Sequence, residues 1–194
     1  IYINSDLTGG KLLLKKDTST YTQASSPSYT FAANSTWQIY TYSGYIQVGY
    51  SSFSFNGNIM FDINSDAIGL PPSIYSPFIS AFGSVNSVYC YSGYNYRPYC
   101  YTNKQLKDLP DITLSVNGVQ IKVPSQIYAT LSSDSGSYRY FNLNFKAISP
   151  SMTGKSYVSP SFNDSIVLDA NFMSYYYTLF DASGGSNVIY LYPS

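Results

Sequence analysis

ITLSVNGVQIKV, residues Ile112–Val123, carries the clearest structural signal in the chain. Apolar and polar residues alternate on both sides of Asn117 and Gly118, which is the pattern of two half-buried β-strands. A two-residue turn between such strands needs a positive φ at both central positions, and Asn followed by Gly adopts that conformation readily. We therefore predict a β-hairpin over this stretch.

Similar strand signals occur on both sides of this hairpin. WQIYTYSGYIQVGY, Trp37–Tyr50, predicts a second pair of strands around Ser43 and Gly44. YYYTLFD, Tyr175–Asp181, is followed by ASGGSN and VIYLY and predicts a third pair. Clusters of Gly, Asn, Ser and Pro separate these segments, as turns separate the strands of an all-β protein.

Helix signals are scarce, and the best one is PSIYSPFISAFG, Pro72–Gly83. Apolar residues recur there at helical spacing, with Pro at the start and Gly at the end. Pro77 limits this segment to a short or kinked helix. We predict an all-β fold with one or two short helices, built as a single domain over residues 1–194.

The composition excludes several classes of partner. The chain has ten basic and ten acidic residues, no net charge, and only 10% charged residues among its 194. No excess of positive charge attracts nucleic acid or acidic lipid, and no apolar run is long enough to span a membrane. The polar surface must come from Ser, Asn, Thr and the 23 Tyr. Such a neutral surface favours a protein partner or self-assembly.

Several features indicate a secretory environment, either outside the cell or in the lumen of the secretory pathway. Cys90 and Cys100 bracket a segment containing Gly and Pro, so we favour a disulfide between them over two free thiols. Asn34 and Asn163 begin N-x-S/T sequons and are candidate glycosylation sites. Because the sequence begins at Ile1 without a signal peptide, we interpret it as a processed or partial chain.

Tyrosines gather around the two cysteines, in Tyr89-Cys90-Tyr91 and Tyr94-Asn95-Tyr96. Tyr combines a large contact area with a polar tip and is enriched at interfaces. We therefore predict that the disulfide-closed loop is a contact surface. The alternative is that these rings fill a β core or face water on alternate strand positions.

The chain contains no His, which excludes Ser-His and Cys-His nucleophile pairs and most transition-metal sites. We expect no metal and no cofactor, and any catalysis must use carboxylates. FDINSD, Phe61–Asp66, places Asp62 and Asp66 between two apolar runs, and Asp169 follows a later one. Two carboxylates that converge from separate elements can share a proton and activate water. Without such a partner, the acids of this stretch are solvated turn residues.

Six sequence blocks occur in the order that characterises the C-terminal lobe of the pepsin-like aspartic peptidases. They are Trp37-Gln38-Ile39, Ile59–Ser65, Leu70-Pro71 before the helix signal, Leu109–Leu114 with Asn117–Gln120 and Val123-Pro124, Ile166–Asp169, and Tyr176–Asp181. The chain thus resembles this family from Trp37 to its end, and residues Ile1 to Ala33 are similar to the entry strands of the lobe. The resemblance implies an all-β lobe.

The resemblance also implies roles for residues of the loop. Asp62 falls on the second catalytic aspartate of the family, and Ser65 keeps a hydroxyl that could support it. Ile63 replaces a Thr that locks the two lobes' loops together, and Asn64 replaces a Gly that admits close backbone approach. The small Gly of the Ile-Leu-Gly block corresponds to Asp169. We therefore interpret Asp62 as vestigial.

Three functions remain open at this point. The favoured one is a secreted, non-catalytic pepsin-like domain that serves binding or assembly. The second is half of an active aspartic endopeptidase, completed by a second chain that supplies the other aspartate, either a separate N-terminal lobe or a second copy. A carbohydrate-binding module is the third, because Tyr and Trp can stack on sugars.

Overall fold

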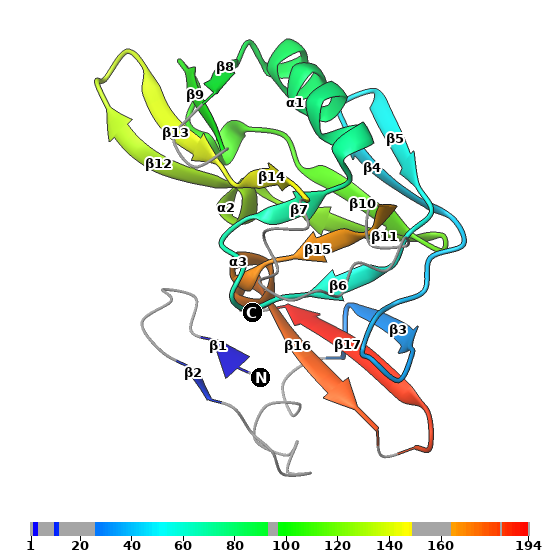
Figure 1. Cartoon of the computed structure of the whole chain (residues 1–194). Helices are drawn as coiled ribbons and strands as arrows, with labels where there is room; N and C mark the ends of the chain where they lie inside the picture. The colour runs from blue at the N-terminus through cyan, green and yellow to red at the C-terminus, as the bar shows by residue number, and fades with distance from the viewer. Residues whose placement is uncertain are drawn as a thin grey trace.

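The computed structural model of the chain describes residues 2–3, 10–11, 26–92, 97–148, 164–182 and 184–193. Within these ranges β-strands are the commonest element, and they form several small sheets accompanied by three α-helices (Figure 1). The helices are α1 (Pro72–Asn86), α2 (Ser125–Tyr128) and α3 (Ala170–Tyr175), and a short 3-10 helix is η2 (Leu106–Asp108). The all-β fold class is confirmed, with three helices rather than one or two.

A central sheet has the strand order β14-β7-β15-β6. Its strands are β14 (Phe145–Ala147), β7 (Ile68–Leu70), β15 (Ile166–Leu168) and β6 (Ile59–Phe61). Two of its pairings are parallel, β14 with β7 and β15 with β6. Parallel neighbours need long crossover connections, so this sheet joins segments from distant parts of the chain.

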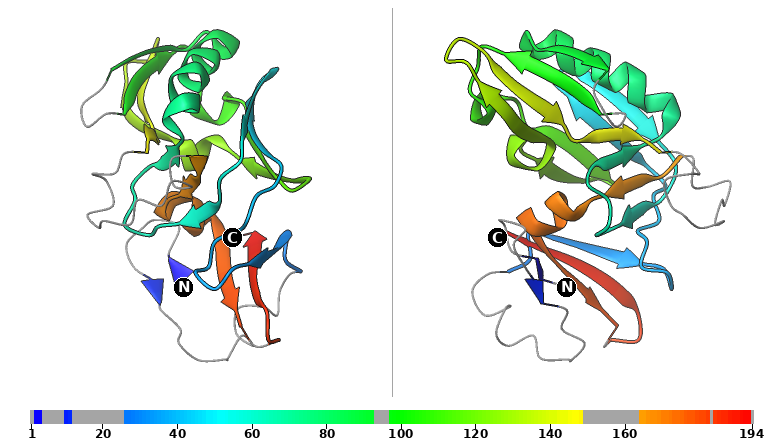
Figure 2. Two further views of the ribbon diagram at one scale, coloured as in Figure 1. Left: turned by 45° about the vertical axis from the view of Figure 1, so that its right-hand side comes forward. Right: turned by 60° about the vertical axis from the view of Figure 1, so that its left-hand side comes forward.

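Four further sheets surround the central one. The sheet β11-β10-β4-β5 contains β11 (Val119–Val123), β10 (Ile112–Val116), β4 (Gly44–Val48) and β5 (Ser51–Phe55). The sheet β12-β13-β9-β8 contains β12 (Ala129–Asp134), β13 (Arg139–Leu143), β9 (Pro98–Thr102) and β8 (Tyr89–Ser92). The sheet β16-β17-β3 contains β16 (Tyr176–Asp181), β17 (Asn187–Pro193) and β3 (Tyr29–Ala33), and β1 (Tyr2–Ile3) pairs with β2 (Gly10–Lys11). The sheet β16-β17-β3 lies at the end of the molecule opposite α1 in all views (Figures 1 and 2).

Two of the predicted hairpins are confirmed. β10 and β11 pair from Ile112 with Val123 to Val116 with Val119, and the turn residues Asn117 and Gly118 have φ of 52° and 86°. β16 and β17 form the hairpin predicted near the end of the chain. In both cases the turn residues between alternating strands were sufficient to identify the pairing.

The strand pair predicted over Trp37–Tyr50 is wrong. Gly44 begins a strand, but β4 pairs with β5 across Gly49 and Tyr50 rather than with the residues before it. Asn117 explains why the earlier segment stays out of the sheet. Its side chain accepts hydrogen bonds from the backbone N–H groups of Tyr42 and Ser43 and donates one to the Tyr40 carbonyl. The side chain therefore takes up backbone groups that a strand ladder would have used.

The helix α1 is longer than the predicted Pro72–Gly83 and continues through Pro77 to Asn86. Ser87 ends it in the left-handed conformation with φ of 53°, and the N–H of Val88 bonds back to the Gly83 carbonyl. Burial of one face explains the extension, because Phe78 and Phe82 are fully buried in the core. Tertiary packing here outweighs the hydrogen bond that Pro77 removes.

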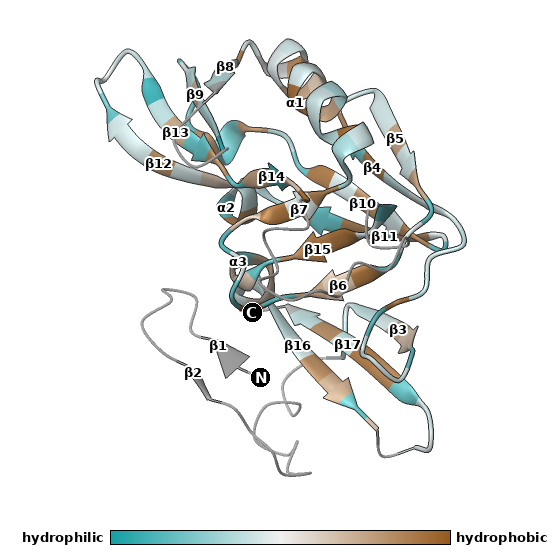
Figure 3. Cartoon of the chain, viewed as in Figure 1, coloured by the Kyte–Doolittle hydropathy of each residue, from teal (hydrophilic) through white to brown (hydrophobic). Residues whose placement is uncertain are grey.

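Aromatic side chains join α1 to the sheets beneath it. Phe78 packs against Phe53 and Phe145, and Phe82 packs edge-on against Tyr128. Apolar residues concentrate on β7, β15 and β10, whereas the tip of the β12–β13 hairpin is polar (Figure 3). None of the described helices is long and apolar enough to cross a membrane.

Candidate functional site

Two distant acids leave the central sheet at the same edge. β6 and β15 run parallel, with Phe61 paired to Leu168. Asp62 follows the first strand and Asp169 follows the second. The backbone N–H of Asp62 donates to the Leu168 carbonyl at 2.9 Å. The parallel pairing thus brings the ends of these two strands together, although Asp62 and Asp169 are far apart in the sequence.

The Asp62 carboxylate is held within its own turn. Its Oδ1 accepts a hydrogen bond from the backbone N–H of Asn64 at 2.9 Å, and its carbonyl accepts from the N–H of Ser65 at 3.1 Å. This is a local side-chain-to-backbone turn of the kind that Asp readily forms. Asp62 is half-buried, and the neighbouring Ile63 is 45% exposed. The loop therefore displays an apolar side chain next to its carboxylate.

Ser65 anchors the loop to the rest of the fold. It is buried, and its hydroxyl donates to the Ala67 carbonyl at 2.7 Å. Its own carbonyl accepts from the N–H of Ala170, in the first turn of α3, at 3.2 Å. A hydroxyl has one proton to donate, so Ser65 uses it within the loop and leaves none for the Asp62 carboxylate.

Asp169 is fully buried and caps the short helix α3. Its carboxylate accepts from the Phe172 N–H at 3.0 Å and from the Asn171 side-chain amide at 3.1 Å. An Asp at this position satisfies a backbone donor at the helix start, which explains why a helix unforeseen in the sequence begins here. Burial raises the pKa of Asp169 to about 6, against the opposing effect of its hydrogen bonds and of Lys146.

Two positively charged side chains, Arg97 and Lys146, lie beside the loop. Asp66 forms ion pairs with Arg97 and with Lys146, the latter at 3.5 Å between Nζ and Oδ1. Lys146 lies on β14, which pairs in parallel with β7, and Arg97 immediately precedes β9. The side chains of Arg97 and Lys146 are 22% and 19% exposed, whereas that of Asp66 is 68% exposed. The sheets thus hold two half-buried cations against an exposed carboxylate.

The two cations also interact with the other carboxylates. Burial lowers the pKa of Lys146 and Arg97 lowers it further, while Asp62 and Asp169 act in the opposite direction. Burial likewise lowers the pKa of Arg97, against the charge of Asp169. Three carboxylates and two cations therefore form one electrostatic cluster, which we call the loop charge cluster: Asp62, Asp66, Asp169, Arg97 and Lys146.

The sequence interpretation identified the three acids of this cluster but not the two cations. Arg97 lies in the segment between the cysteines, and Lys146 lies between Phe145 and Ala147 in a strand. Only the pairing of β14 with β7 brings Lys146 to the loop. A Lys flanked by apolar strand residues, in a chain with ten basic residues, was the one available signal.

The predicted disulfide is confirmed, since Cys90 and Cys100 are bonded and lie opposite each other on β8 and β9. Asn34 is exposed, and its side-chain oxygen accepts bonds from the N–H groups of Thr36 and Gln38. The other candidate glycosylation site, Asn163, lies outside the described residues. Residues 93–96 of the predicted disulfide-closed contact loop, including Tyr94 and Tyr96, also lie outside the described residues, whereas Tyr89 and Tyr91 lie on β8.

The family profile of eukaryotic aspartyl proteases matches residues 1–189 of the chain. Because the match extends over nearly all of the 194 residues, the chain belongs to the eukaryotic aspartyl protease family. The resemblance to pepsin-like aspartic peptidases in the sequence is thereby confirmed. No curated protein matches the chain.

Proposed function

We propose that residues 1–194 form a C-terminal lobe of the pepsin-like kind that serves binding or assembly and does not hydrolyse peptides. In this proposal Asp62 is a structural remnant of a catalytic aspartate. Ser65 stabilises the loop and takes no part in catalysis. The aspartyl protease family and the Cys90–Cys100 disulfide support a secretory or lysosomal compartment for the protein.

The loop charge cluster is the observation that carries the proposal. A peptidase that uses two carboxylates needs one of them protonated, and it obtains this by placing like charges together. Positive charges oppose such a shared proton, and Lys146 acts in this direction on Asp169, although burial outweighs it and raises the pKa of that carboxyl group. Arg97 and Lys146 supply two such charges at the loop that contains Asp62.

The residues next to Asp62 support the same conclusion. Ile63 carries no hydroxyl with which to join a facing loop, and Asn64 carries a side chain where the resemblance to the family implies a Gly. The Ser65 hydroxyl is committed to the Ala67 carbonyl. Each of these features is compatible with a stable turn, and none of them prepares Asp62 to act on water.

The test is a cleavage assay with the full-length protein at about pH 4, where carboxylate pairs are half-protonated. Wild type and Asp62→Asn are incubated with a denatured protein substrate, and an active pepsin-like enzyme serves as the positive control. We expect the two samples to show equal, background cleavage. Cleavage by wild type that Asp62→Asn abolishes would establish the half-peptidase instead, with the second aspartate supplied by a facing lobe.

A further inference from the structure

Tyrosines line up across three strands of the sheet β12-β13-β9-β8. Tyr101 of β9 lies directly opposite Tyr89 of β8 on one side and Tyr140 of β13 on the other. The rings follow this register, with centroids 5.2 Å apart for Tyr89 and Tyr101 and 5.8 Å apart for Tyr101 and Tyr140. Directly opposed side chains on one face of a sheet interact in this way.

A second row and one flanking ring enlarge the group. Tyr91 lies opposite Tyr99, with ring centroids 5.4 Å apart, and Tyr99 stacks on Tyr140 at 6.1 Å. Tyr138, just before β13, packs edge-on against Tyr101 at 5.8 Å. Successive strand residues point to opposite faces, and the buried Cys100 between Tyr99 and Tyr101 faces the core. The six rings therefore form one continuous surface, the tyrosine face: Tyr89, Tyr91, Tyr99, Tyr101, Tyr138 and Tyr140.

The tyrosine face is open to solvent. Tyr89, Tyr91 and Tyr138 are 61%, 51% and 46% exposed, and the other three rings are half-buried against them. Isolated exposed aromatic residues are ordinary, but a contiguous group of this size marks an interaction surface.

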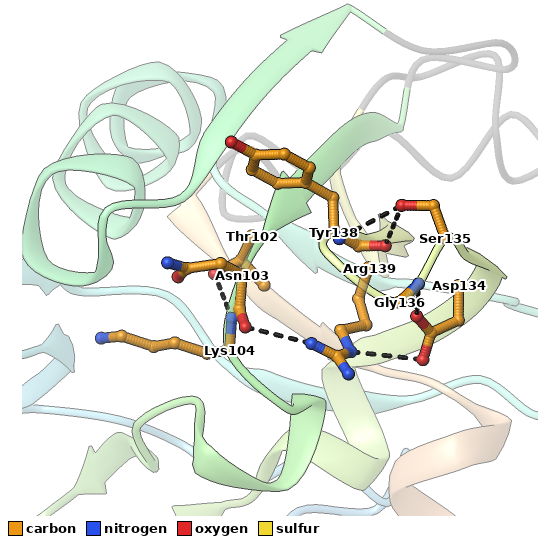
Figure 4. Close-up of polar contacts among 8 residues, drawn as sticks. All are labelled: Thr102, Asn103, Lys104, Asp134, Ser135, Gly136, Tyr138 and Arg139. Atoms are coloured by element: carbon orange, nitrogen blue, oxygen red, sulfur yellow. Dashed lines mark hydrogen bonds and ion pairs between the residues drawn. The ribbon is translucent and has the colours of Figure 1, made fainter.

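No charged side chain belongs to this face among the described residues of the three strands. Arg139 separates Tyr138 from Tyr140 in the sequence but points away from the Tyr138 ring (Figure 4). Its guanidinium donates to Asp134 at 3.2 Å and to the Asn103 carbonyl at 3.1 Å. The Arg139 guanidinium is thus paired away from the Tyr138 ring (Figure 4), and the described strand residues of the face present rings and hydroxyl groups.

We infer that the tyrosine face binds the same face of a second copy of this chain. A two-fold dimer brings identical patches together, so the patch must be complementary to itself. A charged patch would repel its copy, whereas a phenol hydroxyl both donates and accepts hydrogen bonds. The zero net charge of the chain adds no long-range repulsion. Interface centres are likewise enriched in Tyr and depleted in charge.

The size of the face predicts a weak, reversible dimer. A buried Tyr contributes roughly 150–250 Å², so six partly exposed rings offer on the order of 500 Å² per copy. A standard interface buries about 800 Å² per partner. The expected dissociation constant is therefore micromolar rather than nanomolar.

The orientation of the rings argues against a sugar as the occupant. Tyr89 and Tyr101 stack with an interplanar angle of 19°, and Tyr99 and Tyr140 with one of 20°. In each pair, one flat surface of each ring is turned toward the other ring, which reduces the open aromatic face on which a sugar could stack.

A second copy of the chain is thus the partner in the assembly role proposed above. The biological role of the dimer rests on that proposed function, but its formation does not. Sedimentation velocity of the full chain at neutral pH, from about 5 to 500 µM, measures the association directly. We expect wild type to dimerise reversibly. Tyr89→Lys with Tyr91→Lys should weaken the dimer at least tenfold, because four added charges would meet in one interface.

Two controls make the result specific. Tyr40→Lys with Tyr42→Lys adds the same charge at exposed tyrosines near the β10–β11 turn, away from the tyrosine face, and should leave the association unchanged. Tyr89→Glu with Tyr91→Glu, mixed with the Lys variant, should restore the dimer because opposite charges then meet. Near-ultraviolet circular dichroism verifies that each variant is folded.

A wild type that stays monomeric throughout this range would overturn the inference. So would equal weakening by the control pair, or failure of the mixed variants to associate more tightly than either variant alone. None of these results bears on peptide cleavage at acid pH, so the cleavage assay tests the proposed non-catalytic function separately.

Discussion

The buried carboxyl group of Asp169 should make the free energy of unfolding depend on pH, and Asp169→Asn should remove this dependence. Burial raises the pKa of this group from its ordinary 3.8 to about 6. The folded state therefore binds the proton more tightly than the unfolded state. The stability that protonation contributes is fully present below the unfolded pKa and is lost as the pH rises through about 6.

The magnitude follows from the two pKa values. A pKa difference between 3.8 and about 6 corresponds to about 3 kcal/mol of unfolding free energy, at about 1.4 kcal/mol for each pH unit. Between pH 7 and pH 4 about 2.5 kcal/mol of this is realised, because the unfolded carboxyl is partly protonated at about pH 4. Asn171 and Phe172 lie against the carboxylate, and an Asn at this position still caps the helix.

Urea denaturation of wild type and Asp169→Asn at both pH values measures this effect. The difference in unfolding free energy between the two proteins should change by about 2.5 kcal/mol between pH 7 and pH 4, in the direction that favours wild type in acid. Changes that do not depend on pH cancel in this comparison. The same substitution at the exposed Asp108 controls for the loss of one acidic group. A difference that is equal at both pH values, within about 0.5 kcal/mol, would refute the reasoning.

Two further predictions concern the stability of the fold. Phe78→Ala should cost about 3–5 kcal/mol, because the ring is fully buried between Phe53 and Phe145; a loss below about 1 kcal/mol in urea denaturation would contradict this packing. Replacing Cys90 and Cys100 together by Ser should cost about 2–3 kcal/mol, because the disulfide closes a loop between residues ten apart. An unchanged urea midpoint in the double variant would mean that the loop is already ordered without the bond.

Local sequence signals predicted those elements whose structure depends on local geometry. Asn117 and Gly118 set the turn of the β10–β11 hairpin because few other residues adopt its positive φ angles. The same reasoning failed at Ser43 and Gly44, where a side chain 74 residues away takes the backbone donor of Ser43. It also placed the end of α1 too early, at Gly83, because the buried face of the helix maintains it to Asn86.

The candidate site was predictable only in part. The order of the six sequence blocks identified the family and the loop that contains Asp62, because each block consists of residues that are neighbours in the chain. The loop charge cluster could not be found in this way. Lys146 reaches the loop through the pairing of β14 with β7, and Arg97 reaches it from the segment before β9.

The sequence by itself determined the all-β class, the hairpins with strong turn residues, the disulfide and the aspartyl protease family. Turn conformations and side-chain alternation are properties of neighbouring residues, so they can be inferred without a fold. Only the tertiary structure decided which charges surround Asp62 and which tyrosines form one surface. Strand pairing sets both, because it joins residues that the chain keeps far apart and buries them enough for their charges and rings to interact.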